Sequence, residues 1–296
     1  MTSVKKRPVT TPSLGIVRPA RRPPGWIAPG PKPNTELRED LVPAAGEDLC
    51  FLAGDFRIFQ KTNGHRWSAD DLFTAHFAIQ TLARSGSVPR RAVDLGCGIG
   101  TVLLFTAWRY PECVCTGIEA QEVSAHLAER SIAWNGLTDR CSVKLGDLRE
   151  LPFQESLQNA DLVTGTPPYL PVGSGPESSR AQCGPCRFEH RGGIEEYALA
   201  AANVMGRCAP FVACAAGFQR KRVERAALGA GLVLSGWKDV FPKPGKPALF
   251  SVFSMHKPHA GVRFVEQSPL YLRGENDRFT VEHDLARHEL GIPVER

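Results

Sequence analysis

The chain has 296 residues, of which 42% are hydrophobic and 23% are charged, proportions typical of a globular protein whose core needs no disulfide bonds. Nine cysteines are too few for a disulfide scaffold. No apolar run reaches the 18 residues of a membrane span, and the first residues do not resemble a secretory leader. These features exclude the membrane-spanning and small secreted classes, and we expect a cytoplasmic protein.

The formal net charge of +5 is concentrated at one end of the chain. Residues 1–35 hold seven lysines and arginines and no acidic residue, which leaves 29 basic and 31 acidic residues in the rest. Residues 1–40 are also rich in proline and have little to bury, so we predict a disordered basic arm. Such an arm either attracts a polyanion or serves to keep the protein soluble. Its role in organelle targeting stays open, although its prolines disfavour the amphipathic helix of a transit peptide.

Globular sequence begins at about residue 41, and residues 41–88 are expected to form an N-terminal helical segment. Ser68 followed by Asp71 is a capping pattern that begins a helix, and Gly86 is suited to end it. Short apolar runs then alternate with amphipathic stretches. The predicted strands are 91–96, 114–120, 141–147, 160–166, 210–217, 232–241 and 247–256, and the predicted helices are 101–110, 121–136, 192–206 and 219–231.

Strands that alternate with helices form parallel sheets with helices on both faces. The last two strands have only the proline-rich segment 242–247 between them, which predicts a hairpin and hence one antiparallel strand. The expected fold class is therefore α/β. It is a Rossmann-like domain over 41–256, with a seven-stranded, mostly parallel sheet that contains one antiparallel strand. Residues 257–296 are expected to be a C-terminal extension packed on this sheet.

The first predicted strand runs into VDLGCGIG, which places Asp94 just before three alternate glycines, Gly96, Gly98 and Gly100. Glycines allow a tight turn and a close approach of backbone to a ligand, and the next helix begins with free N–H groups. The third glycine comes one residue earlier than in the nicotinamide-binding GxGxxG pattern. The stretch resembles motif I of class I S-adenosylmethionine-dependent methyltransferases, which implies that these four residues bind S-adenosylmethionine.

Two further carboxylates follow in the order that such a cofactor site needs. Glu119 ends the second strand, where a carboxylate can accept hydrogen bonds from both ribose hydroxyls. Asp147 follows the third strand and could accept from the adenine amino group of the cofactor. The alternative is a glycine-rich turn with surface carboxylates, because short motifs also occur by chance.

The fourth strand ends in the residues TPPY, at the edge of the sheet where α/β proteins bind their ligands. These residues resemble motif IV of amino-group methyltransferases, which implies a planar NH2 substrate. The lone pair of such an amine is delocalised, so acceptors must orient it. Thr166 and Pro167 would orient the amino group, Pro168 would stiffen the segment, and Tyr169 would stack on a flipped base. Thr166 stands where Asn is commonest, and its hydroxyl reaches less far.

Among families with this motif, the sequence resembles the bacterial tRNA(Val) adenine-N6 methyltransferases over roughly residues 55–280. Residues 59–78, 187–205 and 269–280 carry the resemblance together with the two motifs, and Asp70 lies in an acidic position expected to face the cofactor. The resemblance implies S-adenosylmethionine as cofactor, no metal, and methylation of adenine N6 in RNA, with tRNA as the first candidate. It further implies a monomer or a weak homo-oligomer.

Arginines in the segment after TPPY are candidate RNA contacts. Arg187, His190 and Arg191 could meet phosphates, or they could lie in a solvated loop. The same segment contains Cys183-x-x-Cys186, which is either a chance pair, a redox pair, or part of a zinc site that would still need further ligands.

Other functions also fit the motifs. The chain could methylate a glutamine amide in a protein, carry a methyltransferase fold with another substrate, or bind RNA or protein without catalysis.

Overall fold

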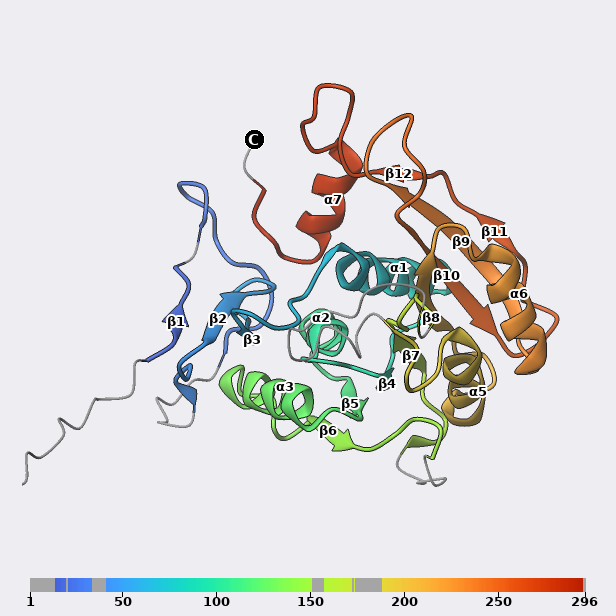
Figure 1. Ribbon diagram of the computed structural model, residues 1–296, viewed down its shortest axis with the longest axis horizontal. Coiled ribbons are helices and arrows are strands. Elements are labelled where there is room, and N and C mark those ends of the chain that lie inside the picture. Colours follow the sequence, from blue (N-terminus) through green and yellow to red (C-terminus); the bar gives the residue numbers. More distant parts are fainter. Residues whose placement is uncertain are drawn as a thin grey trace, which may run out of the picture.

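Two β-sheets organise the computed structural model, which describes residues 14–19, 21–33, 41–150, 157–171, 173 and 188–294 (Figure 1). Within those residues the larger sheet has nine strands, in the order β11-β9-β10-β8-β7-β4-β5-β6, with β12 beside β9. Its strands are β4 (Arg91–Leu95), β5 (Val114–Glu119), β6 (Cys141–Leu145), β7 (Leu162–Gly165), β8 (Phe211–Ala216), β9 (Val233–Phe241), β10 (Phe250–His256), β11 (Val265–Glu266) and β12 (Leu270–Tyr271).

The predicted fold class is confirmed. Strands β4 to β8 are parallel to one another, and β10 is antiparallel to both β8 and β9, as expected from the proline-rich hairpin. The sheet has two more strands than the seven predicted. The additional strands are β11 and β12, which contain two residues each. So short a strand shows no periodicity in the sequence.

Helices cover both faces of the large sheet (Figure 1). On one face lie α1 (Ala69–Ser85), α2 (Thr101–Arg109) and α3 (Glu122–Trp134), and on the other lie α5 (Ile194–Val204) and α6 (Arg220–Gly229). Helix α7 (Val281–Glu289) packs against α1. Among the described residues, none of these helices is long and apolar enough to cross a bilayer.

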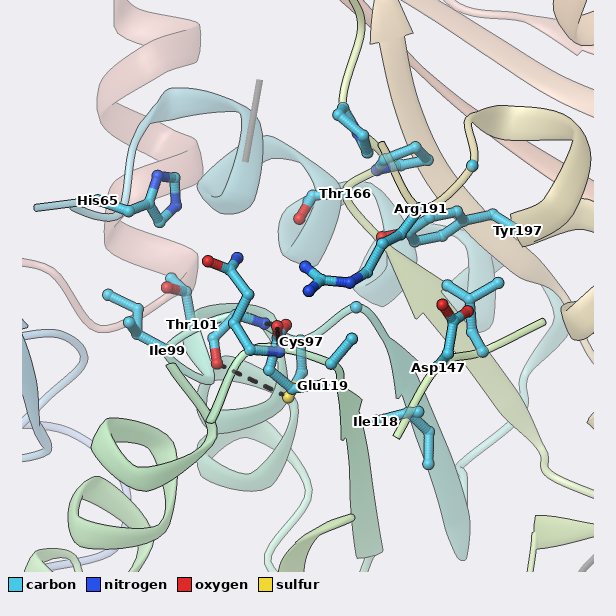
Figure 2. A pocket seen from close by; sticks show the side chains of 18 of the residues that line it. His65, Cys97, Ile99, Thr101, Ile118, Glu119, Asp147, Thr166, Arg191 and Tyr197 are labelled. Carbon is cyan, nitrogen blue, oxygen red and sulfur yellow. Dashed lines mark hydrogen bonds between the residues drawn. The ribbon is translucent and has the colours of Figure 1, made fainter. Parts of the chain in front are cut away.

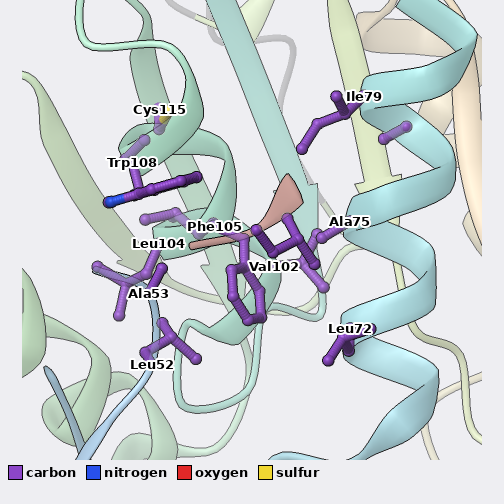
Figure 3. Packing of buried hydrophobic residues seen from close by; sticks show 14 of the residues in the cluster. Leu52, Ala53, Leu72, Ala75, Ile79, Val102, Leu104, Phe105, Trp108 and Cys115 are labelled. Carbon is purple, nitrogen blue, oxygen red and sulfur yellow. The ribbon is translucent and has the colours of Figure 1, made fainter. Parts of the chain in front are cut away.

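Alternate residues of the central strands point to opposite faces of the sheet and therefore pack into two separate cores. Ala92 packs with the α1 and α2 side, whereas Val93 packs with the α5 and α6 side. Figure 3 shows the first core, in which Leu72 of α1 faces Val102 and Phe105 of α2. Burial of a ring such as that of Phe105 contributes about 1.5–3 kcal/mol. These two layers hold the carboxyl ends of the strands, where the site lies, in fixed positions.

The segment before α1 differs from the prediction. Residues 41–88 were expected to be helical, but β2 (Glu47–Phe51) and β3 (Arg57–Lys61) form an antiparallel pair, and helix begins only at Ala69. The start of α1 agrees with the capping pattern, because the Asp71 carboxylate accepts from Ser68 N at 2.9 Å. Its end agrees too, since Gly86 is left-handed with φ of 67°.

Part of the arm expected to be disordered is ordered. β1 (Ile16–Val17) pairs in parallel with β2 and completes a three-stranded sheet. The cause is electrostatic: Asp48 of β2 is fully buried, and Arg18 and Arg66 both donate to its carboxylate at 2.9 Å. Burial alone would raise the pKa of Asp48, but the two guanidinium groups bring it below its usual value. Residues 1–13 and 34–40 of the predicted arm lie outside the described residues.

A second buried carboxylate ties the small sheet to α3, and its charge makes a testable prediction. Glu47 accepts from Lys61 at 2.8 Å and from Arg130 at 2.7 Å. Burial opposes ionisation, yet the two cations lower the pKa of Glu47 from 4.5 to about 2. Since the folded pKa is the lower one, the stabilisation is complete above pH 4.5 and is lost as the pH falls toward 2.

Glu47→Gln is therefore expected to lower the free energy of unfolding at pH 7 by about 1.5–3 kcal/mol, the worth of hydrogen bonds to a charged group. Urea titrations at several pH values measure this, and the deficit should shrink as the pH falls below 4.5. The exposed Glu112→Gln variant is the control. A deficit that did not change between pH 7 and pH 3 would contradict the assigned ion pairs.

Trp108, at the end of α2, joins segments that are far apart in the sequence. Its indole is 7% exposed and is flanked by Gly30 of the arm, Gly54 of the β2–β3 turn and Gly291 after α7. A Cβ at any of these three glycines would overlap the ring. Gly54 N also donates to Gly291 O at 2.8 Å, so both ends of the described chain meet at this ring.

Candidate functional site

A pocket of about 920 Å³, counting the space at its mouth, lies at the carboxyl ends of β4, β5, β6 and β7. Ligand pockets of α/β sheets lie at this edge. Of the residues predicted for the site, those that line the pocket are Asp70, Gly96, Gly98, Glu119, Asp147, Thr166, Pro167, Pro168 and Tyr169. Asp94 and Gly100 are not among the lining residues.

The glycine loop has the backbone that its sequence predicts. Gly96 and Gly98 have φ of 59° and 55°, in the left-handed region that disfavours other residues. A Cβ on Gly96 would also overlap the Tyr197 hydroxyl, whereas the space beside Gly98 is open. A ligand can therefore approach the backbone closely at Gly98. Gly100, with φ of 87°, caps α2 instead of facing the pocket.

Asp94 lies beneath the loop. Its carboxylate accepts from Leu103 N at 3.1 Å and from the Thr164 hydroxyl at 2.8 Å. Burial raises the pKa of Asp94 to about 7. These contacts fix the first turn of α2 to strand β7, so the residue positions the loop from below.

Glu119 forms the floor of the pocket. One carboxylate oxygen accepts from Gly98 N at 2.8 Å and the other from Gln121 N at 2.6 Å. The residue is 6% exposed, and burial raises the pKa of its carboxyl group above the usual value. Each oxygen keeps a further lone pair, which is what a diol needs from a carboxylate.

Asp147 is paired more fully than the sequence indicates. Arg149 donates to its two oxygens at 2.9 and 2.6 Å, and this partner lowers the pKa of Asp147. Arg191, from the segment before α5, also reaches into the pocket between Thr166 and Glu119 (Figure 2). Its charge favours the ionised forms of both Glu119 and Asp147.

The TPPY segment is held from α1 and from the end of β8. The Tyr169 hydroxyl donates to Asp70 Oδ2 at 2.9 Å and lies 3.0 Å from Cys214 Sγ. Gln219, at the start of α6, donates to the Tyr169 carbonyl oxygen at 3.0 Å. The hydroxyl of Tyr169 is thus anchored inside the protein, while its ring lines the pocket. Proline rigidity at 167 and 168 is reinforced by these tertiary contacts.

Asp71 is buried close to Thr166. Burial and the neighbouring charge of Asp70 raise the pKa of Asp71 well above its usual value, and the nearby Thr166 hydroxyl opposes this rise. Two consecutive carboxylates in the first turn of α1 therefore line the pocket beside the TPPY segment, and Asp70 holds its last residue. From the sequence Asp71 was predicted only as a helix cap; its position beside Asp70 was the signal that could have identified it.

Other residues of the pocket were not predicted at all. His65, Gln121 and Tyr197 line it from three different segments, and no motif marks them. Arg191 was predicted as a phosphate contact and lies in the pocket wall. Arg187, Cys183 and Cys186 lie outside the described residues. Among the residues that are described, no group of three or more His, Cys, Asp or Glu side chains could hold a metal.

Comparison with known proteins agrees with this geometry. Residues 92–170, from β4 to the end of TPPY, match the family described as "Methyltransferase domain". The crystal structure of a predicted O-methyltransferase from Agrobacterium tumefaciens superposes with a TM-score of 0.56 at 19% identity, covering 77% of this chain and 99% of the other. Residues 92–170 thus match a methyltransferase domain, and the chain has the fold of the class I S-adenosylmethionine-dependent methyltransferases. The predicted resemblance to class I S-adenosylmethionine-dependent methyltransferases is thereby confirmed.

Two relatives of the methyltransferase domain have named substrates. A tRNA1(Val) (adenine(37)-N6)-methyltransferase from Porphyromonas gingivalis is 30% identical over 122 residues, which is 40% of this chain and 47% of the relative. A 4-amino-L-phenylalanine/4-methylamino-L-phenylalanine methyltransferase from Streptomyces pristinaespiralis is 33% identical over 95 residues, 32% and 31% of the two chains. The chain thus spans less than half the length of each.

Proposed function

We propose that this protein transfers a methyl group from S-adenosylmethionine to an exocyclic amino group, with adenine N6 of RNA as the substrate and tRNA as the first RNA to test. The observation that carries the proposal is the continuity of one pocket. A glycine loop and a buried carboxylate suited to a nucleoside line one part of it, and the TPPY segment lines another.

The residues present fit the proposed cofactor. Glu119 is buried and keeps lone pairs for the two ribose hydroxyls, while Gly98 leaves its side open for a close backbone approach. Asp147 keeps lone pairs beyond its pair with Arg149, so it can still accept from an adenine amino group. When bound, S-adenosylmethionine supplies an electrophilic methyl group on a sulfonium.

The TPPY end fits a planar amine. A Thr166 hydroxyl that donated its hydrogen to the nearby Asp71 carboxylate would present only lone pairs to the pocket, so it would accept from an amine N–H without competing as a donor. The Thr166 hydroxyl would thus act as a hydrogen-bond acceptor, as the amide oxygen of asparagine does in the commoner motif. Because its pKa is raised, Asp71 is also a stronger base that can take up the amine proton through the Thr166 hydroxyl. Tyr169 offers its ring face for stacking.

The names of the relatives support an amino-group substrate. One is named for adenine N6 in a tRNA, and the other for an amino-substituted phenylalanine. Both matches are partial, so the test must compare substrate classes. Labelled S-adenosylmethionine should be supplied with total tRNA, total protein and DNA, followed by mass spectrometry of the nucleosides. Labelled N6-methyladenosine is the expected product. Label found only in protein would favour a glutamine amide instead, and no transfer to any class would favour a binder.

The role of the Thr166–Asp71 pair can be measured separately. Thr166→Val keeps the shape of the side chain and removes its hydroxyl, so kcat is expected to fall about 10- to 100-fold, the worth of roughly 1.5–3 kcal/mol of charge-assisted hydrogen bonding. Asp71→Asn should have a similar effect and should remove the acidic limb of the pH profile of kcat. Cofactor affinity, measured by calorimetry, should stay within a few-fold.

If the two side chains act together, the double variant should be no slower than the slower single variant, because effects within one hydrogen-bonded unit are not additive. Multiplying effects in the double variant would show that Asp71 acts independently of the Thr166 hydroxyl. Thr166→Asn is the conservative control and is expected to keep most of the activity.

A further inference from the structure

A second groove, of about 1640 Å³ counting the space at its mouth, lies in the C-terminal extension and contains a concentration of positive charge. Arg273 and Arg278 come from the loop after β12, Arg287 from the last turn of α7, and Arg21 from the N-terminal arm. Phe279 lines the same groove with 46% of its surface exposed. We call these five residues the arginine groove. Since the body of the protein is close to neutral, four arginines from three segments stand out.

The sheet topology places this groove at the edge that carries the active site. β10 is antiparallel to both β8 and β9, so β8 and β9 end at the same edge. The pairing register puts Ala216, Phe250, Val240 and Leu270 in one row across β8, β10, β9 and β12. Three inter-strand spacings, or about 14 Å, therefore separate the end of β8 from β12.

The end of β8 leads directly to the TPPY segment. Gln219, three residues beyond Ala216, donates to the Tyr169 carbonyl oxygen. Between them is Phe218, an aromatic side chain that is 82% exposed. An exposed ring at this edge provides a face on which a base can stack. An exposed aromatic side chain thus lies at the sheet edge that the pocket and the arginine groove share.

The loop of the groove is built to present its guanidinium groups. Arg273 Nη1 donates to Asp277 O at 2.6 Å, and its guanidinium carbon lies 4.2 Å from the centre of the Phe279 ring. That ring is stacked in turn on His283, with centroids 4.1 Å apart. The column orders the loop, so its cations would lose little conformational entropy on binding an anion.

Acidic groups near the groove do not cancel its charge. Asp277 and Asp284 line it against the four arginines, which leaves an excess of two positive charges. Asp284 lies 3.1 Å from His283 Nδ1, and Asp277 lies 3.7 Å from Lys243 of the β9–β10 hairpin. Glu275 of the same loop is exposed. The hairpin adds two further exposed cations, Lys243 and Lys246.

We propose that the arginine groove binds the phosphate backbone of the RNA beside the nucleotide that is methylated; this inference rests on the proposed function. Guanidinium groups bind phosphates in pairs of hydrogen bonds, and exposed aromatic rings stack on bases, which together are the features of a single-stranded RNA surface. The base enters the pocket while the adjoining backbone crosses the end of the sheet to the groove.

The test removes two charges that have no assigned role in folding. The groove variant, Arg21→Gln/Arg278→Gln, changes two exposed groove residues. The control variant, Arg90→Gln/Arg207→Gln, removes two exposed charges that precede β4 and β8, at the opposite edge of the sheet. Binding of fluorescently labelled bulk tRNA should be measured against KCl concentration. The groove variant is expected to bind about tenfold more weakly at low salt, and its salt slope should fall by roughly 1.4–1.8, the value for two phosphate contacts. The control pair should resemble wild type.

Calorimetry with S-adenosylmethionine should give equal affinities for all three proteins, and methyl transfer should show the loss in KM for RNA with kcat preserved. Equal tRNA binding by the two variant pairs, or no tRNA binding by wild type, would overturn the groove. A wild type that binds tRNA through the groove without methylating it would instead overturn the proposed function. RNA methylation that is indifferent to both pairs would keep the function and overturn the groove.

Discussion

Replacement of Glu119 by alanine is expected to weaken S-adenosylmethionine binding by a factor of about 10²–10³. The reason is the loss of two charge-assisted hydrogen bonds to the ribose, each worth roughly 1.5–3 kcal/mol. The same carboxylate accepts from Gly98 N and Gln121 N, so its removal also frees the loop that the nucleoside would contact. Isothermal titration calorimetry with the cofactor measures the effect directly.

The exposed Glu129→Ala variant, on α3 and away from the pocket, is the control and should bind like wild type. Affinity should also depend on pH. Since burial raises the pKa of Glu119, the accepting carboxylate is lost as the pH falls through that raised value, and binding should weaken there. Unchanged affinity in Glu119→Ala would mean that the pocket does not hold the ribose in the proposed way.

Tyr169→Ala is expected to lower kcat/KM for RNA by about 10²–10³, with cofactor affinity nearly unchanged. Loss of base stacking accounts for roughly 1–3 kcal/mol, and loss of the anchor on Asp70 loosens the TPPY segment further. Steady-state methyl transfer to RNA at several RNA concentrations measures the effect, with a thermal unfolding curve to verify that the variant is folded.

Tyr169→Phe separates the two contributions, because it keeps the ring and removes only the hydroxyl. We expect a loss of about tenfold or less for this variant, in line with one hydrogen bond. Equal losses in the two variants would mean that the hydroxyl anchor, and not the ring face, is the important part of Tyr169. Stacking of the target base on this residue would then be wrong.

Residues that line the pocket at the end of a strand could be predicted from the sequence. Gly96, Gly98, Glu119 and the TPPY segment stand at the ends of β4, β5 and β7, and parallel strands bring their carboxyl ends to one edge. Each motif is a short local stretch of sequence, and the parallel sheet brings these stretches together at one edge to form the pocket. The same reasoning located all seven main strands.

Residues that act through contacts between distant segments could not be predicted in this way. Arg149 neutralises Asp147, and Gln219 holds the Tyr169 carbonyl oxygen. Nothing in the local pattern of either residue indicates its partner. Asp94 is a different case: its motif position was read correctly, but only the packed structure places it under the loop, bonded to Thr164.

The small N-terminal sheet was missed because its strands hide charged residues. Glu47, Asp48 and Gln60 are all buried, so β2 and β3 lack the apolar alternation that identifies a strand. The cationic partners of Glu47 and Asp48, including Arg18 of the arm, lie 14 or more positions away along the chain. Part of the basic, proline-rich arm is thus ordered by an ion pair with a buried carboxylate of β2.

The ring of Trp108 makes the two ends of the polypeptide depend on each other. Arg21 lies in the N-terminal segment that contacts this indole at Gly30. Arg287 lies shortly before Gly291, which contacts the same ring. An affinity tag, a deletion or a proteolytic cut that disturbs one of these two segments is therefore expected to disturb the other one as well. Because Arg21 and Arg287 line the arginine groove, such a change is also expected to weaken the RNA binding proposed for that groove.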